Sequence, residues 1–139
     1  MATRAVLDTN VILAAHHSRN PASPGVEILD RWERGEFVLL CTADVITKYA
    51  EKLIEAGAPQ AAADRFLSAI ALNGTFVLIE FFHFRHYPED ADDIAFLLCA
   101  LNGDATHLVT YDTHLHVLQP HYALAICEPL RFLAELRAA

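Results

Sequence analysis

The sequence lacks any apolar stretch long enough to cross a lipid bilayer, which takes about 20 consecutive apolar residues. Its N-terminus also lacks the basic segment followed by an apolar core that marks a secretory signal. These absences argue against a membrane protein and against an exported one. We therefore expect a cytoplasmic protein that makes no contact with a membrane.

Cysteine is scarce as well. The three cysteines, Cys41, Cys99 and Cys127, are odd in number, and none belongs to a paired C-x-x-C spacing. A disulfide framework and a cysteine-type zinc site are therefore both disfavoured. Each cysteine lies in an apolar run, so we expect reduced thiols packed in a core, as is usual in a reducing compartment.

Positive charge is the third scarce component, with 10 Lys and Arg against 18 Asp and Glu and a formal net charge of −8. Broad, sequence-independent binding of nucleic acid needs many basic side chains to displace counterions, so this composition argues against it. An enzyme that acts on nucleic acid remains compatible with the charge. Its phosphate contacts would be local, and metal ions bound by clustered carboxylates would offset the remaining repulsion.

What the chain does contain is a large apolar fraction, 54% of 139 residues, which suffices for one domain spanning residues 1–139 with a substantial core. Short apolar runs alternate with segments of helical periodicity, and this alternation predicts a parallel sheet with right-handed crossovers. The expected strands are Arg4–Leu7, Phe37–Cys41, Thr75–Ile79, His107–Thr110 and Ala123–Ile126. The expected helices are about 11–17, 24–34, 43–56, 60–72, 92–101, 113–118 and 129–136, with a loop at 81–90.

Two aspartates lie between an expected buried strand and an expected helix: Asp8 directly follows its strand, and Asp112 follows one residue after the end of its strand. Ligands of open parallel sheets bind outside the carboxyl ends of the strands, so both carboxylates should face one crevice and attract a divalent cation. Each aspartate also fits a plain helix N-cap, which needs no function. Asn10, two residues after Asp8, is placed to hydrogen-bond the Asp8 carboxylate and fix its orientation.

A third acidic feature is Asp90-Ala91-Asp92-Asp93, with three carboxylates in four residues at the start of a helix. The helix dipole offsets only part of their mutual repulsion, and a cation would relieve the rest. A solvated acidic loop is the alternative. Carboxylate oxygens suit Mg²⁺ or Mn²⁺ better than zinc. The chain has eight histidines, but no H-E-x-x-H pattern defines a zinc site among them.

The segments 6–10, 90–96 and 108–112 together resemble the PIN-domain family, most closely the VapC-like ribonucleases of bacterial toxin–antitoxin pairs. The resemblance covers nearly the whole chain. It implies a three-layer α/β/α sandwich around a mostly parallel five-stranded sheet, hydrolysis of RNA by a Mg²⁺- or Mn²⁺-dependent endoribonuclease, a homodimer and an inhibitory antitoxin partner. The residues that carry over as catalytic are Asp8, Asp93 and Asp112, with Asp92 as a further metal ligand.

The chain departs from the family pattern on the helix that follows the second strand. The family usually has a glutamate where this chain has Lys48. Glu51, one turn later, and Asp44, one turn earlier, are possible substitutes, and Glu51 also fits a solvated helix residue. Asn10, Thr110, Lys48 and Glu51 are the candidates for contacting substrate or supporting the site. Lys48 keeps a second hypothesis open, a PIN-like binding or regulatory module without strong nuclease activity, because an ammonium close to the carboxylates could take the place of a cation.

Overall fold

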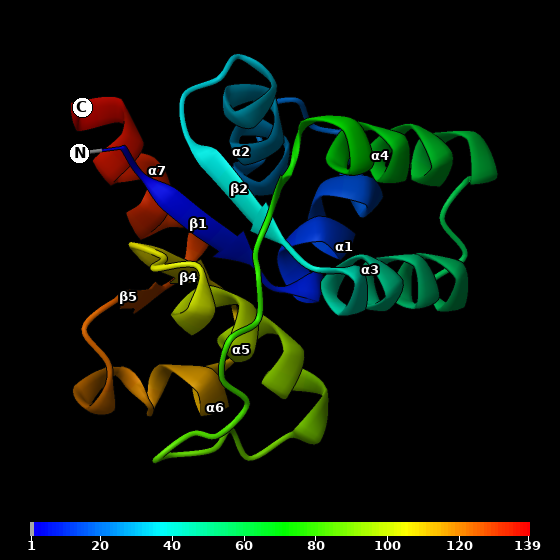
Figure 1. Ribbon diagram of the computed structural model, residues 1–139. Helices are drawn as coiled ribbons and strands as arrows, with labels where there is room; N and C mark the ends of the chain where they lie inside the picture. The colour runs from blue at the N-terminus through cyan, green and yellow to red at the C-terminus, as the bar shows by residue number, and fades with distance from the viewer. Residues whose placement is uncertain (1) are drawn as a thin grey trace.

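The computed structural model describes residues 2–139, which form a five-stranded sheet in the order β3-β2-β1-β4-β5 with every pairing parallel (Figure 1). The predicted α/β class is confirmed, and the sheet is parallel throughout rather than mostly so. The central strand is β1, which pairs with β2 on one side and with β4 on the other. The strands are β1 (Arg4–Leu7), β2 (Val38–Cys41), β3 (Thr75–Phe76), β4 (His107–Val109) and β5 (Ala125–Cys127).

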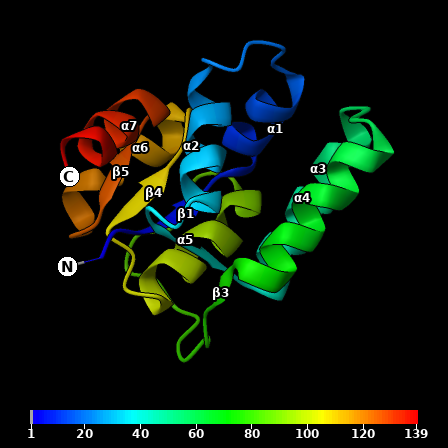
Figure 2. The same ribbon diagram turned by 90° about the horizontal axis from the view of Figure 1, so that it is seen from above.

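Helices cover both faces of this sheet. On one side α1, α2 and α7 pack together, while α5 and α6 lie on the other side (Figure 1). The helices α3 and α4 lie side by side at the outer edge of the molecule (Figure 2). The helices are α1 (Thr9–His17), α2 (Pro24–Glu33), α3 (Ala43–Glu55), α4 (Gln60–Asn73), α5 (Ile94–Asn102), α6 (Thr113–His116) and α7 (Pro129–Ala138), with short 3-10 turns η1 (Ala91–Asp93) and η2 (Gln119–His121).

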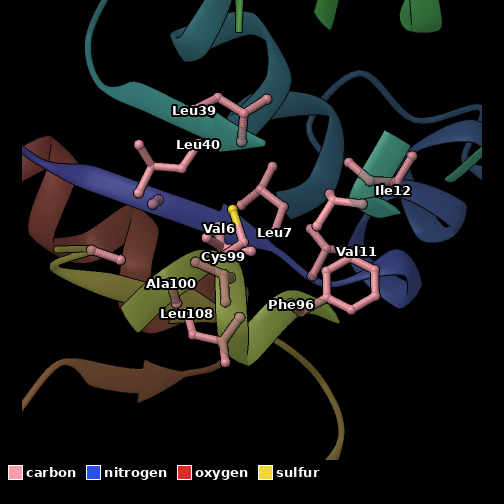
Figure 3. Close-up of a cluster of buried hydrophobic side chains, with 14 of the residues drawn as sticks. Val6, Leu7, Val11, Ile12, Leu39, Leu40, Phe96, Cys99, Ala100 and Leu108 are labelled. Atoms are coloured by element: carbon pink, nitrogen blue, oxygen red, sulfur yellow. The ribbon is translucent and has the colours of Figure 1, made fainter. Parts of the chain in front are cut away.

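The core lies where β1 passes between these layers. Side chains of the three central strands meet the buried faces of α1 and α5 (Figure 3). Because α5 is apolar nearly all round, it lies enclosed between the sheet and α3. The three cysteines are buried and free, as predicted, and burial raises the pKa of the Cys99 thiol to about 12. Within residues 2–139, every helix is too short or too polar to span a bilayer.

Two strand boundaries differ from those predicted by more than one residue. The third strand stops at Phe76 instead of Ile79 because its partner β2 ends at Cys41, whose carbonyl oxygen accepts the last bond from the Val77 amide. Beyond it, the amides of Glu80 and Phe81 bond to the Asn102 side chain instead. The fifth strand starts at Ala125 instead of Ala123, because the carbonyl oxygens of Tyr122 and Leu124 accept hydrogen bonds from the Gln119 side-chain amide and not from a neighbouring strand.

One buried hydrogen bond ties α3 to the central strand at the point where the strand ends. The Tyr49 hydroxyl, which is fully buried, donates to the Leu7 carbonyl oxygen at 2.5 Å, one residue before Asp8. We predict that Tyr49→Phe lowers the free energy of unfolding by about 1–2 kcal/mol, because a buried carbonyl loses its donor. Urea denaturation measures the change. Tyr111→Phe, which alters a 41% exposed tyrosine, is the control and should stay within about 0.5 kcal/mol.

Candidate active site

Asp8 and Asp112 lie at the same edge of the sheet, as the sequence predicted. Their strands β1 and β4 are hydrogen-bonded neighbours with Leu7 opposite Val109, and the Asp8 amide donates to the Val109 carbonyl oxygen at 2.9 Å. Both residues also cap helices: Asp8 Oδ1 accepts from the Thr9 amide at 2.7 Å, and Asp112 Oδ1 accepts from the His114 amide at 2.9 Å. Each cap uses one carboxylate oxygen, so capping and a role at the site are compatible.

Thr110 and Asn10 hold the second oxygen of Asp8. The buried Thr110 hydroxyl donates to Asp8 Oδ2 at 2.7 Å, and the Asn10 amide nitrogen reaches the same oxygen at 3.3 Å. Asn10 is itself held by the Tyr111 amide, which donates to its Oδ1 at 3.2 Å. The hydrogen bond expected between Asn10 and Asp8 is therefore present. Together these contacts fix the orientation of a carboxylate that is only 4% exposed.

Asp93 is the least satisfied polar residue at this edge. It ends η1 just before α5, is 7% exposed, and its buried Oδ2 has no hydrogen-bond partner within the part of the chain that the structure describes. Burial, the negative charges of Asp8, Asp112 and Asp90, and a side-chain hydrogen bond with Asp112 together raise the pKa of its carboxyl group from 3.8 to about 7, and burial is the largest of these causes. Burial also raises the pKa of the Asp8 carboxyl group, and the negative charge of Asp112 raises this pKa as well. The three carboxyl groups therefore share one electrostatic site.

Asp92, the next residue along, has a different environment from Asp93. Its side chain is 56% exposed and binds the Lys48 ammonium group, with 2.9 Å between Oδ1 and Nζ. This hydrogen bond and the charge of Lys48 hold the pKa of Asp92 below its ordinary value. Among residues 2–139, the hydrogen bond and the ion pair of the Lys48 ammonium group are both with Asp92. Lys48 therefore pairs with the exposed aspartate rather than with the buried ones.

The remaining candidates lie at the margin. Glu51 is exposed on α3 and acts on Lys48 only through its charge. Asp90 Oδ1 accepts from the Asp92 amide at 2.9 Å and so caps η1.

A hollow of about 430 Å³ is lined by Glu89, Asp90, Ala91, Asp112 and His114, and it opens the site to solvent at Asp112. A larger cavity of about 520 Å³ between α1, α2 and α4 is lined by none of Asp8, Asp90, Asp92, Asp93 and Asp112.

The donor set fits a hard divalent cation. Carboxylate oxygens are the ligands of Mg²⁺, which commonly keeps several waters and takes only one or two carboxylates from the protein. The unpartnered Oδ2 of Asp93 is a ready ligand atom. Among residues 2–139, no three His, Cys, Asp or Glu side chains already stand close enough to hold an ion. Asp8, Asp93 and Asp112 are the residues that would hold one, with solvent completing the coordination.

Some features of the site have no signal in the sequence. The periodicity of α3 predicts that Tyr49 is buried, but not that its hydroxyl binds the end of β1. The ion pair between His114 and Glu89, at 2.7 Å, joins α6 to the loop before η1 and could not be predicted because the loop has no regular pattern. The contrast between buried Asp93 and exposed Asp92 depends on the rotation of η1.

The family model of the PIN domain matches residues 4–114, and the chain belongs to the PIN-domain family. Members of this family are generally metal-dependent nucleases. Among solved structures, the chain is similar to the PIN domain of T. brucei RRP44, with a TM-score of 0.53 at 15% identity, over 99% of this chain and 83% of the other. At that identity the likeness shows the fold alone. No curated protein matches the chain.

The raised pKa of Asp93 predicts how stability depends on pH. The folded chain holds this proton with a pKa of about 7, against an ordinary value of 3.8. The contribution of this group is therefore complete below about pH 4 and is lost as the pH rises through about 7. In EDTA, we expect Asp93→Asn to remove this loss and to be more stable than the native chain at pH 8, by on the order of 2–4 kcal/mol.

Urea denaturation at pH 5 and pH 8 measures this effect. Asp30→Asn, which changes an exposed aspartate on α2, is the matched control and should leave the pH dependence unchanged. If Asp93→Asn proves less stable than the native chain at pH 8, the Asp93 carboxylate makes favourable contacts there and the crowding argument is wrong.

Proposed function

We propose that this protein is a Mg²⁺- or Mn²⁺-dependent endoribonuclease whose catalytic and metal-binding residues are Asp8, Asp93 and Asp112. The observation that carries the proposal is the buried Oδ2 of Asp93, which has no hydrogen-bond donor among residues 2–139 and lies in a site shared with two further carboxylates. A buried carboxylate without a partner is costly unless a proton or a cation compensates it. Membership of the PIN-domain family favours the cation.

Each side chain of the site has a task in this function. Asp8, Asp93 and Asp112 would bind the ion, while Thr110 and Asn10 keep the Asp8 carboxylate in one orientation. A divalent ion at this position supplies the two effects that phosphodiester hydrolysis needs, an acidified water molecule and neutralised charge on the leaving oxygen. The hollow beside Asp112 gives an RNA phosphate access to the carboxylates from solvent.

The biological setting is part of the same proposal and rests on the resemblance of the sequence to the VapC-like branch. In that setting the protein is the toxin of a toxin–antitoxin pair, acts in the cytoplasm as a homodimer, and is inhibited by an antitoxin protein. Asp92 and Lys48, which form an exposed ion pair next to the site, would then lie at its rim, where Lys48 can contact a substrate phosphate.

The second candidate function is a PIN module with weak or no nuclease activity. The observation that favours it is Lys48, which stands where the family usually has a glutamate and which binds Asp92 instead of leaving that carboxylate free for a metal. The position of Lys48 limits this candidate. Because its ammonium group is bound to the exposed Asp92, it leaves the buried carboxylates of Asp8 and Asp93 available to a cation.

We predict that millimolar Mn²⁺ stabilises the folded protein and that Asp8→Asn abolishes the effect. Binding to the native state alone adds roughly 2.7 kcal/mol at a hundredfold excess over Kd, which corresponds to a rise in melting temperature on the order of 10 °C. Thermal denaturation with and without Mn²⁺ is the measurement, and Asp30→Asn is the control that should keep the full rise. A melting temperature that Mn²⁺ does not change would rule out the metal site.

The nuclease activity itself is tested with a mixed-sequence RNA in Mg²⁺, in Mn²⁺ and in EDTA. The proposal expects internal cleavage in either metal, none in EDTA, and none with Asp8→Asn in any buffer. Stabilisation by Mn²⁺ without cleavage of RNA would favour the second candidate.

Lys48→Glu separates the two candidates more finely. It restores an acidic residue at the position where the family usually has one and releases Asp92 from its ion pair, so we expect higher Mn²⁺-dependent cleavage than in the native chain. Lys52→Glu makes the same change of charge one turn along α3, where Lys52 pairs with Glu55, and should have no such effect. Strong native activity that falls in Lys48→Glu would show instead that the lysine is a working part of the site.

A further inference from the structure

The loop between β3 and α5 lies against α6 and η2, next to the candidate active site (Figure 1). Three contacts hold it there. The rings of His86 and His121 stack with 3.6 Å between centroids and 19° between planes, and the Tyr122 hydroxyl donates to the His86 carbonyl oxygen at 2.5 Å. Glu89 pairs with His114 at 2.7 Å. We call the surface formed by residues 82–87 together with His114 and His121 the loop–α6 surface.

Aromatic rings are concentrated on this surface and several are uncovered. Residues 82–87 read Phe-His-Phe-Arg-His-Tyr, so five of six side chains carry a ring. Phe82 is 66% exposed and Tyr87 is 52% exposed, although burial of such rings is worth about 1.5–3 kcal/mol each. Tyr87 packs edge-on against Phe84, with 5.0 Å between ring centroids, but half of its surface and two thirds of that of Phe82 stay open to solvent.

The loop–α6 surface also carries a positive charge, that of Arg85, which forms no ion pair with a carboxylate among residues 2–139. Of the 10 Lys and Arg side chains, six pair with carboxylates: Arg31, Arg34, Lys48, Lys52, Arg131 and Arg137. The guanidinium group of Arg85, which is exposed on the loop, has no carboxylate within 4.0 Å among residues 2–139. It is free to bind an anion, in a chain whose net charge is −8.

This surface is continuous with the catalytic carboxylates. The hollow of about 430 Å³ beside Asp112 is lined by both Glu89 and His114, which pair with each other, and Glu89 follows the exposed Tyr87 by only two residues. A flexible polymer whose phosphate lies in that hollow would therefore extend onto the aromatic segment.

We infer that the loop–α6 surface binds the unpaired nucleotides that flank the cleaved bond of the RNA substrate. This inference rests on the proposed function and deepens it, since it names the part of the molecule that holds the RNA on either side of the cleaved bond. Bases of any sequence stack on aromatic side chains and imidazoles, while Arg85 and imidazole N–H groups bind the phosphates between them. A duplex keeps its bases stacked internally and offers no face to these rings, so paired RNA binds weakly.

The test measures binding separately from cleavage. Fluorescence anisotropy of a labelled mixed-sequence 12-nucleotide RNA is recorded with chains that carry Asp8→Asn, so that the RNA stays intact. In this background we expect Tyr87→Ala, Phe82→Ala and Arg85→Ala each to weaken binding by about tenfold, the range expected for one stacked base or phosphate contact. Phe76→Ala and Arg65→Ala are matched controls, because they remove an aromatic that is 56% exposed on β3 and an exposed arginine on α4.

The outcomes distinguish failure of this inference from failure of the proposed function. Weaker binding in the three loop variants alone, with a preference for the single strand over a duplex of equal length, supports the inference, provided that the variants with native Asp8 keep their stabilisation by Mn²⁺. Equal binding by loop and control variants, while the native chain still cleaves RNA, overturns the inference and leaves the nuclease intact. If the native chain neither binds nor cleaves RNA, both fail. If the loop variants abolish self-association instead of RNA binding, the surface is a protein interface.

Discussion

The burial of Asp8 and Asp93 beside Asp112 is the constraint on which the rest of this structure depends. Burying a carboxylate is costly unless hydrogen bonds or an opposite charge compensate it. Asp8 is compensated by the Thr110 hydroxyl, the Asn10 amide and the Thr9 amide, whereas one oxygen of Asp93 has no donor among the described residues. The raised pKa of both groups expresses the same cost. A carboxylate site arranged in this way needs a proton or a cation to compensate it, and the ammonium group of Lys48 is bound to Asp92 instead.

The strand order of the parallel sheet brings Asp8, Asp93 and Asp112 to one edge of the molecule. The chain runs outward from β1 to β2 and β3, and then returns to β4 on the other side of β1, so the carboxyl ends of β1 and β4 form the switch point at which such sheets bind ligands. Asp8 and Asp112 stand at those two ends. Asp93 reaches the same point because α5 begins there and packs against both strands. The Tyr49 hydroxyl, bound to the last carbonyl of β1, fixes α3 against the same edge.

Much of this arrangement could be predicted from the sequence, because it depends on local patterns. The apolar runs that end in Asp8 and Asp112 predict two strand ends, the alternation with helices predicts that they share an edge, and the spacing of Asn10 predicts its hydrogen bond. The rest depends on contacts between distant segments. Thr75–Ile79 is apolar enough for a longer strand, but β2 ends too early to pair with it. The pairing of Lys48 with Asp92 joins residues 44 positions apart. That Asp93 is buried while Asp92 is exposed depends on the turn of η1, which a run of aspartates does not specify.

In the proposed function, an acidic protein could act on RNA because its contacts with the polyanion would be confined to one metal-binding edge and the surface next to it. The most direct test of the central claim is a crystal structure of the native chain soaked in Mn²⁺, with anomalous diffraction to locate the ion. The account predicts an anomalous peak among Asp8, Asp93 and Asp112, with Asp93 Oδ2 as a ligand and the Lys48 ammonium still on Asp92. It would be contradicted if no peak lies there at saturating Mn²⁺, or if the Lys48 ammonium occupies that place instead.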